Sequence, residues 1–82
     1  MALQAEQIRQ TLRESNAEFR RLEEEHARTA ELLGELERKP RPQPEEQEEM
    51  ARLKKLKLRA KDRMEELIHD YRREQAEAVQ AT

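Results

Sequence analysis

Apolar residues recur through the first half of the chain at alternating intervals of three and four residues. Two lines of positions share this spacing: Ala5, Leu12, Phe19, His26 and Leu33, and Ile8, Ser15, Leu22, Thr29 and Leu36. Such a pattern keeps one face of an α-helix turned toward a partner helix. It predicts one helix over about residues 3–38, and the polar seam positions indicate a specified register.

The second half of the chain repeats the alternating spacing. Its apolar positions are Met50, Leu53, Ala60, Met64, Leu67 and Tyr71, interrupted by Lys57. The pattern predicts a second helix over about residues 45–76. Leu56 and Ile68 widen the apolar stripe to either side of this seam.

Three prolines separate the two halves. Pro40, Pro42 and Pro44 alternate with other residues, and each proline lacks an N–H and disfavours helix in the residue before it. Glu45 and Glu46 follow, as is favourable at the start of a helix, where carboxylates meet the positive end of the helix dipole. We therefore expect a turn at residues 39–44.

Two helices of similar length joined by a short turn predict an all-α fold, an antiparallel two-helix hairpin that is coiled-coil-like. It would form one domain over residues 1–82. Folding back about Gln43 places three apolar pairs opposite each other: Phe19 with Met64, Leu12 with Tyr71, and Leu33 with Met50.

The composition suits long helices with a narrow apolar seam. Of the 82 residues, 34% are hydrophobic and 44% charged, yet the net charge is only -2. A disordered chain would also be polar, but it would not need phased apolar positions. No uncharged apolar run approaches the ~20 residues that cross a bilayer, and Met1–Gln10 does not resemble a signal peptide. We expect a cytoplasmic protein without a membrane segment.

The residue types give little support for catalysis or a cofactor. There is no cysteine, and the two histidines, His26 and His69, belong to distant levels of the hairpin, so a metal site is not expected. A two-helix hairpin also offers no enclosed pocket to exclude water. We expect no enzyme activity, no catalytic residues and no cofactor.

A basic segment on the second predicted helix is the first candidate for function. Seven cations lie within Arg52–Arg63, with Asp62 as the one acid. The candidate interaction surface consists of Lys54, Lys55, Lys57, Leu58, Arg59 and Lys61. An acidic protein partner or the phosphates of a nucleic acid could bind it. Glu23–Glu25 could instead neutralise it internally, and no aromatic residues are interleaved for base stacking.

His26 and Asp62 form a second candidate constellation, lying about one turn from direct opposition across the hairpin. They could form a hydrogen-bonded, pH-sensitive pair. The alternative is that His26 only fixes the register of the seam. We treat the two residues as a candidate structural pair.

Apolar residues beside the seam predict self-association. The stripe of Leu56, Leu67 and Ile68, together with Leu32, exceeds what one partner helix covers, and Leu58 points away from the seam. A dimer forming an antiparallel four-helix bundle would bury these residues. A monomer that binds a different protein is the alternative.

The motif Phe-x-x-Leu-x-x-x-His, followed after the turn by a lysine-rich run, resembles the YdcH-like family of small bacterial proteins of unknown function. The matching positions are Phe19, Leu22, His26, Leu53, Lys54, Lys55, Lys57, Leu58, Lys61, Asp62 and Met64. The chain departs from the pattern at Ala60 and Thr29, where larger apolar residues are usual. The resemblance implies a helical hairpin and transfers no activity.

These observations together predict a non-enzymatic protein-interaction module, a homo-oligomer or a hairpin that binds an unidentified protein. The alternative function is a nucleic-acid-associated protein that uses Arg52–Arg63.

Overall fold

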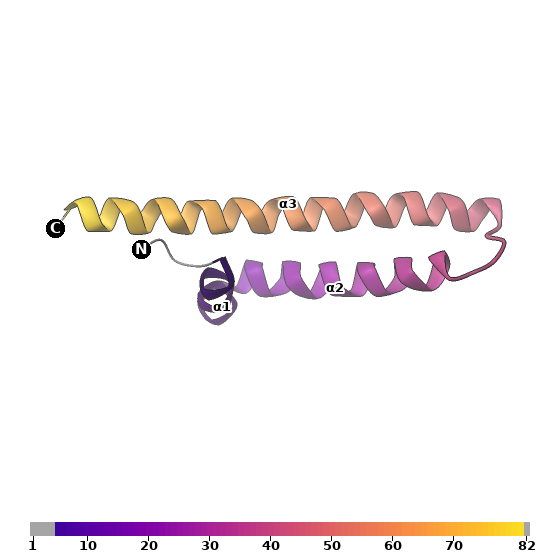
Figure 1. Cartoon of the computed structure of the whole chain (residues 1–82), viewed down its shortest axis with the longest axis horizontal. Helices are drawn as coiled ribbons and strands as arrows, with labels where there is room; N and C mark the ends of the chain where they lie inside the picture. The colour runs from indigo at the N-terminus through magenta and orange to yellow at the C-terminus, as the bar shows by residue number, and fades with distance from the viewer. Residues whose placement is uncertain (1–4, 82) are drawn as a thin grey trace.

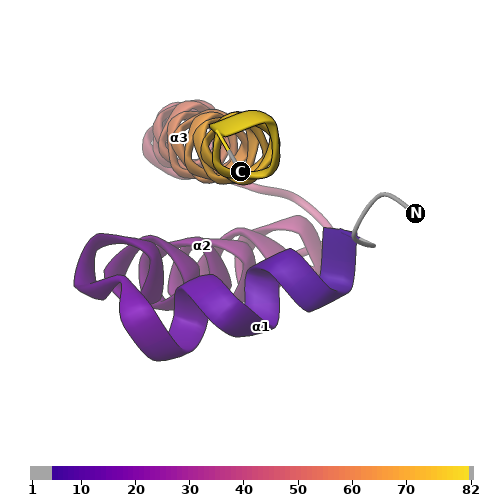
Figure 2. The same cartoon turned by 90° about the vertical axis from the view of Figure 1, so that its left-hand side faces the viewer.

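A computed structural model of the chain describes residues 5–81, with side chains to residue 79. It contains three helices, α1 (Ala5–Ser15), α2 (Ala17–Glu37) and α3 (Pro44–Ala81), and residues 5–81 contain no strand. The molecule is a rod of 59 × 22 × 17 Å. Helices α2 and α3 run side by side in opposite directions, and α1 lies across one end of the pair (Figures 1 and 2). The predicted all-α class is confirmed.

The proline segment reverses the chain between α2 and α3. Gln43 caps α3: its carbonyl accepts from the Gln47 N–H at 2.9 Å, and its own N–H donates to the Glu46 carboxylate at 2.9 Å. Pro44 occupies the first position of the helix, where its missing N–H costs nothing. Helix α3 then continues to Ala81, beyond the predicted end at residue 76.

The prediction of one unbroken helix over residues 3–38 is wrong. The chain leaves helical geometry at Asn16, with φ -129° and ψ 108°, and its side chain accepts a hydrogen bond from the Phe19 N–H at 3.0 Å. Asparagine is among the preferred residues for capping a helix start in this way. Arg20 completes the bend by donating to the Arg13 carbonyl at 2.9 Å. The predicted start at residue 3 lies outside the described residues.

The bend at Asn16 folds α1 onto the other two helices. Four buried residues form the resulting core: Ile8, Leu12, Phe19 and Ile68. Met64, Leu67 and Tyr71 pack against it, so the members of two expected pairs, Phe19 with Met64 and Leu12 with Tyr71, share this cluster. Ile68 belongs to this core and not to an exposed side stripe, contrary to the prediction, because α1 covers it.

Farther from α1, only α2 and α3 are in contact. Leu33 of α2 and Leu53 and Ala60 of α3 are buried there. Along this stretch the two long sides of the α2–α3 pair stay open, and both are hollowed by grooves. Over the described residues, no helix has the combination of length and apolar character that spanning a bilayer requires.

Candidate interaction surface

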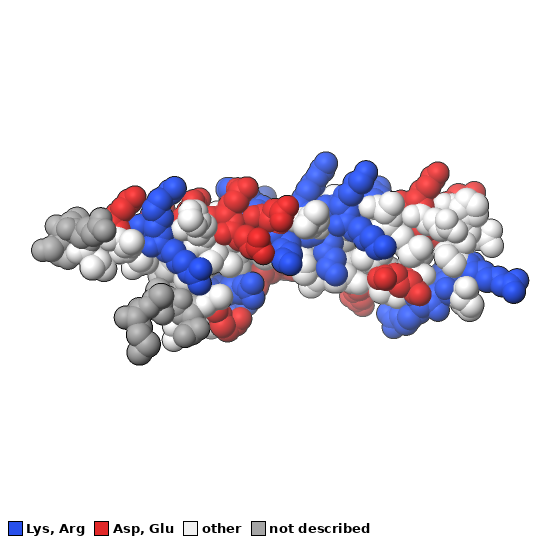
Figure 3. All heavy atoms as spheres, turned by 45° about the horizontal axis from the view of Figure 1, so that its top comes forward, with Lys and Arg blue, Asp and Glu red and all other residues white. Residues whose placement is uncertain are grey.

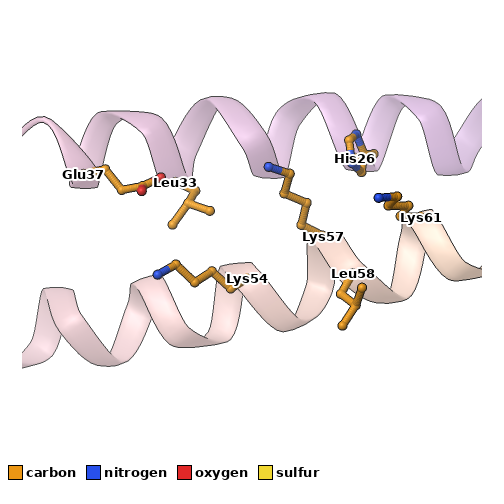
Figure 4. A pocket seen from close by; sticks show the side chains of 7 residues that line it. All are labelled: His26, Leu33, Glu37, Lys54, Lys57, Leu58 and Lys61. Atoms are coloured by element: carbon orange, nitrogen blue, oxygen red, sulfur yellow. The ribbon is translucent and has the colours of Figure 1, made fainter.

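One side of the α2–α3 pair carries a groove lined by much of the predicted basic surface. Lys54, Lys57, Leu58 and Lys61 line it from α3, and the wall from α2 is made by His26, Leu33 and Glu37 (Figure 4). The groove has a volume of about 350 Å³. The α3 residues are spaced by three, four and seven positions, which places them on one helix face.

The α3 side chains that line this basic groove point in different directions. In Figure 4, Lys57 reaches from α3 toward α2, whereas Leu58 points away from α2. Leu58 is 56% exposed, Lys54 and Lys61 are exposed, and Lys57 is half-buried. The groove therefore combines cationic groups with accessible apolar surface at its rim.

The groove lysines are free of ion pairs in the described part of the chain. Among the described residues, no carboxylate forms an ion pair with Lys54, Lys57 or Lys61. Glu37 is the one acid among the lining residues and stands on the opposite wall. Figure 3 shows Lys and Arg side chains over the middle of the rod and others toward both of its ends.

The expected internal neutralisation by Glu23–Glu25 is not observed in the described part of the chain. Glu23 accepts instead from Arg13, whose Nε and Nη2 lie 2.6 and 2.9 Å from its two oxygens. The bend at Asn16 brings Arg13 to this carboxylate. The hydrogen bond that Arg13 donates to Glu23 raises the pKa of Arg13.

Arginines flanking the lysine run take up other carboxylates. Arg63 donates to Glu18 of α2 at 2.9 and 3.1 Å and to Glu66 at 2.8 Å. Arg52 pairs with Glu49. The hydrogen bond from Arg63 holds the pKa of Glu18 below its ordinary value, and the one from Arg52 does the same for Glu49. The guanidinium groups of Arg52 and Arg63, with their forked donors, are thus paired, whereas the groove lysines have no ion-pair partner among the described residues.

The predicted surface does not stay together as one patch. Arg59 lines a groove on the opposite side of the pair, and Lys55 is exposed and lines neither groove. Successive residues on a helix are separated by about 100°, so neighbouring cations point in different directions. Only four of the six predicted surface residues, Lys54, Lys57, Leu58 and Lys61, share a groove.

His26 and Asp62 are not hydrogen-bonded to each other in the described structure. His26 is half-buried on α2 and borders both the basic groove and a second hollow beside α1. Asp62 is exposed, because it lies about 160° around α3 from Met64, which packs on the core. No group of three potential metal ligands assembles among the described residues.

Sequence reasoning missed the α2 wall of the basic groove. Leu33 and Glu37 follow His26 at intervals of seven and eleven residues, which places all three on one helix face. That spacing was a usable signal. The apolar spacing predicts Leu33 only as a residue of the hydrophobic seam, whereas its side chain also lines the groove.

Comparison with known proteins confirms the family resemblance that the lysine-rich pattern indicates. A family model described as "Protein of unknown function (DUF465)" matches residues 19–68, which run from the first turn of α2 to Ile68 in α3. The chain belongs to this family. This family is the YdcH-like family of small bacterial proteins. No curated protein and no solved structure matches the chain.

Proposed function

We propose that this protein is a non-enzymatic interaction module whose α2–α3 hairpin binds an acidic segment of another protein in the basic groove. The observation that carries the proposal is the convergence of Lys54, Lys57 and Lys61 on one groove, where no carboxylate of the described residues is paired with them. Complementary charge across an interface favours encounter and selects among partners.

The spacing of the groove residues suggests the form of the partner. Lys54 and Lys61 are separated by seven residues, or about 10 Å along the helix axis. A helical partner with carboxylates two turns apart would present them at the same interval. An apolar residue between those carboxylates would contact Leu33 and Leu58, so the groove favours an amphipathic acidic helix over a wholly polar one.

The non-enzymatic part of the proposal rests on the groove's construction. His26 is the imidazole beside it, and no carboxylate among the described residues orients that imidazole by a hydrogen bond. Proton-transfer catalysis depends on acid and base groups held within hydrogen-bonding reach of the reacting atoms. A groove of separated lysines is better suited to holding a charged partner.

Self-association is the second part of the proposal. Leu56 is 39% exposed and Leu32 is 44% exposed, and both lie away from the basic groove. A protein of this size builds only a small core by itself, and helical domains of this kind gain stability by associating. Two copies would leave each basic groove available to a partner.

Fluorescence anisotropy with labelled probes tests the acidic-partner proposal. The probes are an amphipathic peptide of about 20 residues with glutamate and leucine on one face, and duplex and single-stranded DNA of similar length, each at about 50 and 200 mM salt. We expect the peptide to bind more tightly than either DNA. DNA binding that exceeds peptide binding and falls steeply with salt would favour the nucleic-acid alternative instead.

Two charge reversals on α3 show whether binding uses the groove. Lys61→Glu alters a groove residue, whereas Lys55→Glu makes the same charge change at an exposed position outside both grooves. We expect Lys61→Glu to weaken peptide binding about tenfold and Lys55→Glu to leave it within about twofold. Equal losses from the two variants would show that net charge, not the groove, attracts the peptide.

A further inference from the structure

The side of the α2–α3 pair opposite the basic groove has a different lining. Leu22 and Thr29 of α2 and Leu56 and Ala60 of α3 border a hollow of about 380 Å³, with Glu25 and Arg59 at its edges. Ala60 and Thr29 contribute the small side chains of this lining, which leave room between the helices.

Leucines extend this side beyond the hollow, and we call the whole the leucine face. Leu36 stands seven residues after Thr29, and Leu67 stands seven residues after Ala60, so each continues the same helix face. Both are half-buried. The leucine face therefore follows the α2–α3 pair along much of its length.

The edges of the leucine face carry opposite charges. Glu25 stands on the α2 edge and Arg59 on the α3 edge, at the same level of the rod, since both border the same hollow. In the described part of the chain, neither takes part in an ion pair. Glu18 lies two turns from Glu25 and Arg63 lies one turn from Arg59, and these two residues are already paired with each other.

We infer that a second copy of this chain covers the leucine face, related to the first by a two-fold axis parallel to the helices. This inference rests on the proposed self-association and specifies its geometry. The rotation sets α2 of each copy against α3 of the other. Glu25 then faces Arg59 of the second copy, the reverse pair forms by symmetry, and Leu56 of each copy approaches the other's hollow beside Thr29 and Ala60.

The charges select this arrangement over the other two-fold packing of the same face. An axis perpendicular to the helices would set α2 against α2 and bring the two edges that carry Glu25 together, with the two Arg59 edges also facing each other. Like charges placed across an interface are unfavourable. The parallel axis instead matches acid with base on both edges and gives a bundle in which every adjacent pair of helices is antiparallel.

A charge-swap experiment tests the geometry. The variants Glu25→Lys and Arg59→Glu each place like charges at both symmetric contacts, so we expect each alone to self-associate about tenfold more weakly than the wild type in sedimentation velocity. An equimolar mixture of the two restores attraction at both contacts. We expect the mixture to form a heterodimer that returns to about the wild-type affinity.

The mixture separates contacts between copies from effects within one chain, because one variant cannot repair the internal packing of the other. Circular dichroism of each variant establishes that it is folded. A wild type that remains monomeric at every accessible concentration would overturn both self-association and this interface. A wild-type dimer whose single variants are unaffected, or whose mixture shows no recovery, would overturn the two-fold arrangement alone.

Two identical substitutions two residues apart provide the matched control. Leu56→Glu places a carboxylate in the leucine face, whereas Leu58→Glu places one at the basic groove. We expect Leu56→Glu to abolish dimerisation and to keep peptide binding. Leu58→Glu should weaken peptide binding and keep the dimer. A Leu58→Glu variant that loses the dimer as completely as Leu56→Glu would contradict the assignment of the interface to the leucine face.

Discussion

The two ends of the rod are built differently. At the end that carries α1, three helices enclose Ile8 and Phe19, both of which are 0% exposed. At the proline-turn end, only α2 and α3 meet, and Leu33 and Leu53 are buried along a single line of contact. The first end has a core with three walls, whereas the second has a seam with open sides.

This difference separates stability from recognition. Fully enclosed apolar side chains contribute most to folding free energy, so the α1 end should hold the fold together. The open sides of the α2–α3 pair leave both the basic groove and the leucine face accessible. Beside α1 lies a second hollow, which continues from the basic groove. The two share His26 and Lys61 in their linings.

The largest effect should come from truncating the α1-end core. Phe19→Ala removes a fully buried ring, and we expect the free energy of unfolding to fall by about 3–5 kcal/mol. Leu33→Ala in the two-helix seam should cost less, about 2–3 kcal/mol, because the open sides let the site relax. Urea denaturation measures both. A Leu33→Ala loss equal to or above that of Phe19→Ala would contradict the difference between the two ends.

Removing the cap between α1 and α2 should weaken the same end by less. Asn16→Ala loses the acceptor for the Phe19 N–H, and we expect a loss of about 1 kcal/mol in thermal or urea unfolding. Asn16→Asp is the control, since its carboxylate can accept the same hydrogen bond and favours a helix start. If both variants lost equal stability, the side-chain cap would not be what holds the bend.

A substitution at Gly34 should stabilise the end of the rod that carries the proline turn. Gly34 lies within α2, and a Cβ added there would meet the Arg38 Nη2 at 3.5 Å, an ordinary contact. We expect Gly34→Ala to raise the free energy of unfolding by about 0.5–1 kcal/mol, because alanine is the better helix former. Ala30→Gly on the same helix should lower it by a similar amount. A loss of stability in Gly34→Ala would indicate crowding at Arg38.

Acidification should have the smallest effect on the free energy of unfolding. It protonates carboxylates near both ends of the rod. Arg63 lowers the pKa of Glu18, and Arg52 lowers that of Glu49. A carboxyl group whose pKa is lower in the folded state stabilises the fold fully above its unfolded pKa, and this contribution disappears as pH falls through the folded value. We expect stability to decline from about pH 5 toward pH 3.

A neutral variant isolates the Glu18 contribution to acid sensitivity. Glu18→Gln cannot titrate, so urea denaturation across this pH range should show a shallower decline than in the wild type. An unchanged pH dependence would mean that the ion pair between Glu18 and Arg63 does not contribute in solution.

Much of the architecture could be predicted from local chemistry, because prolines interrupt helices and the regular apolar spacing marks helix faces. The break at Asn16 could not be predicted from that spacing, since the line from Leu12 to Phe19 continues through it unchanged. Ser15 and Asn16, a polar seam residue followed by a preferred cap residue, were the local signal. Spacing alone cannot decide whether such a pair sits inside a helix or ends one.

The basic groove could be predicted in part. The intervals between Lys54, Leu58 and Lys61 already place them on one face of α3. The same helix geometry separates Arg59 from them, since it lies about 140° around the helix from Lys54. Which of these faces borders α2 depends on how α3 packs, and no residue of the segment encodes that by itself. The pairing of Glu23 with Arg13 depends on the bend at Asn16, so the loss of Glu23 as a partner for the lysines follows from a feature 38 residues before Lys54 in sequence.

The crosswise position of α1 makes the two ends of the rod different in shape. The end that carries α1 is the broad head, and the end with the proline turn is the narrow tip. Rotation about an axis along its length would keep this difference, so a pair of copies would carry two heads at one end and two proline tips at the other. Their basic grooves would then point in opposite directions. Such a particle could bridge two acidic helices held on either side of it, both in the same orientation.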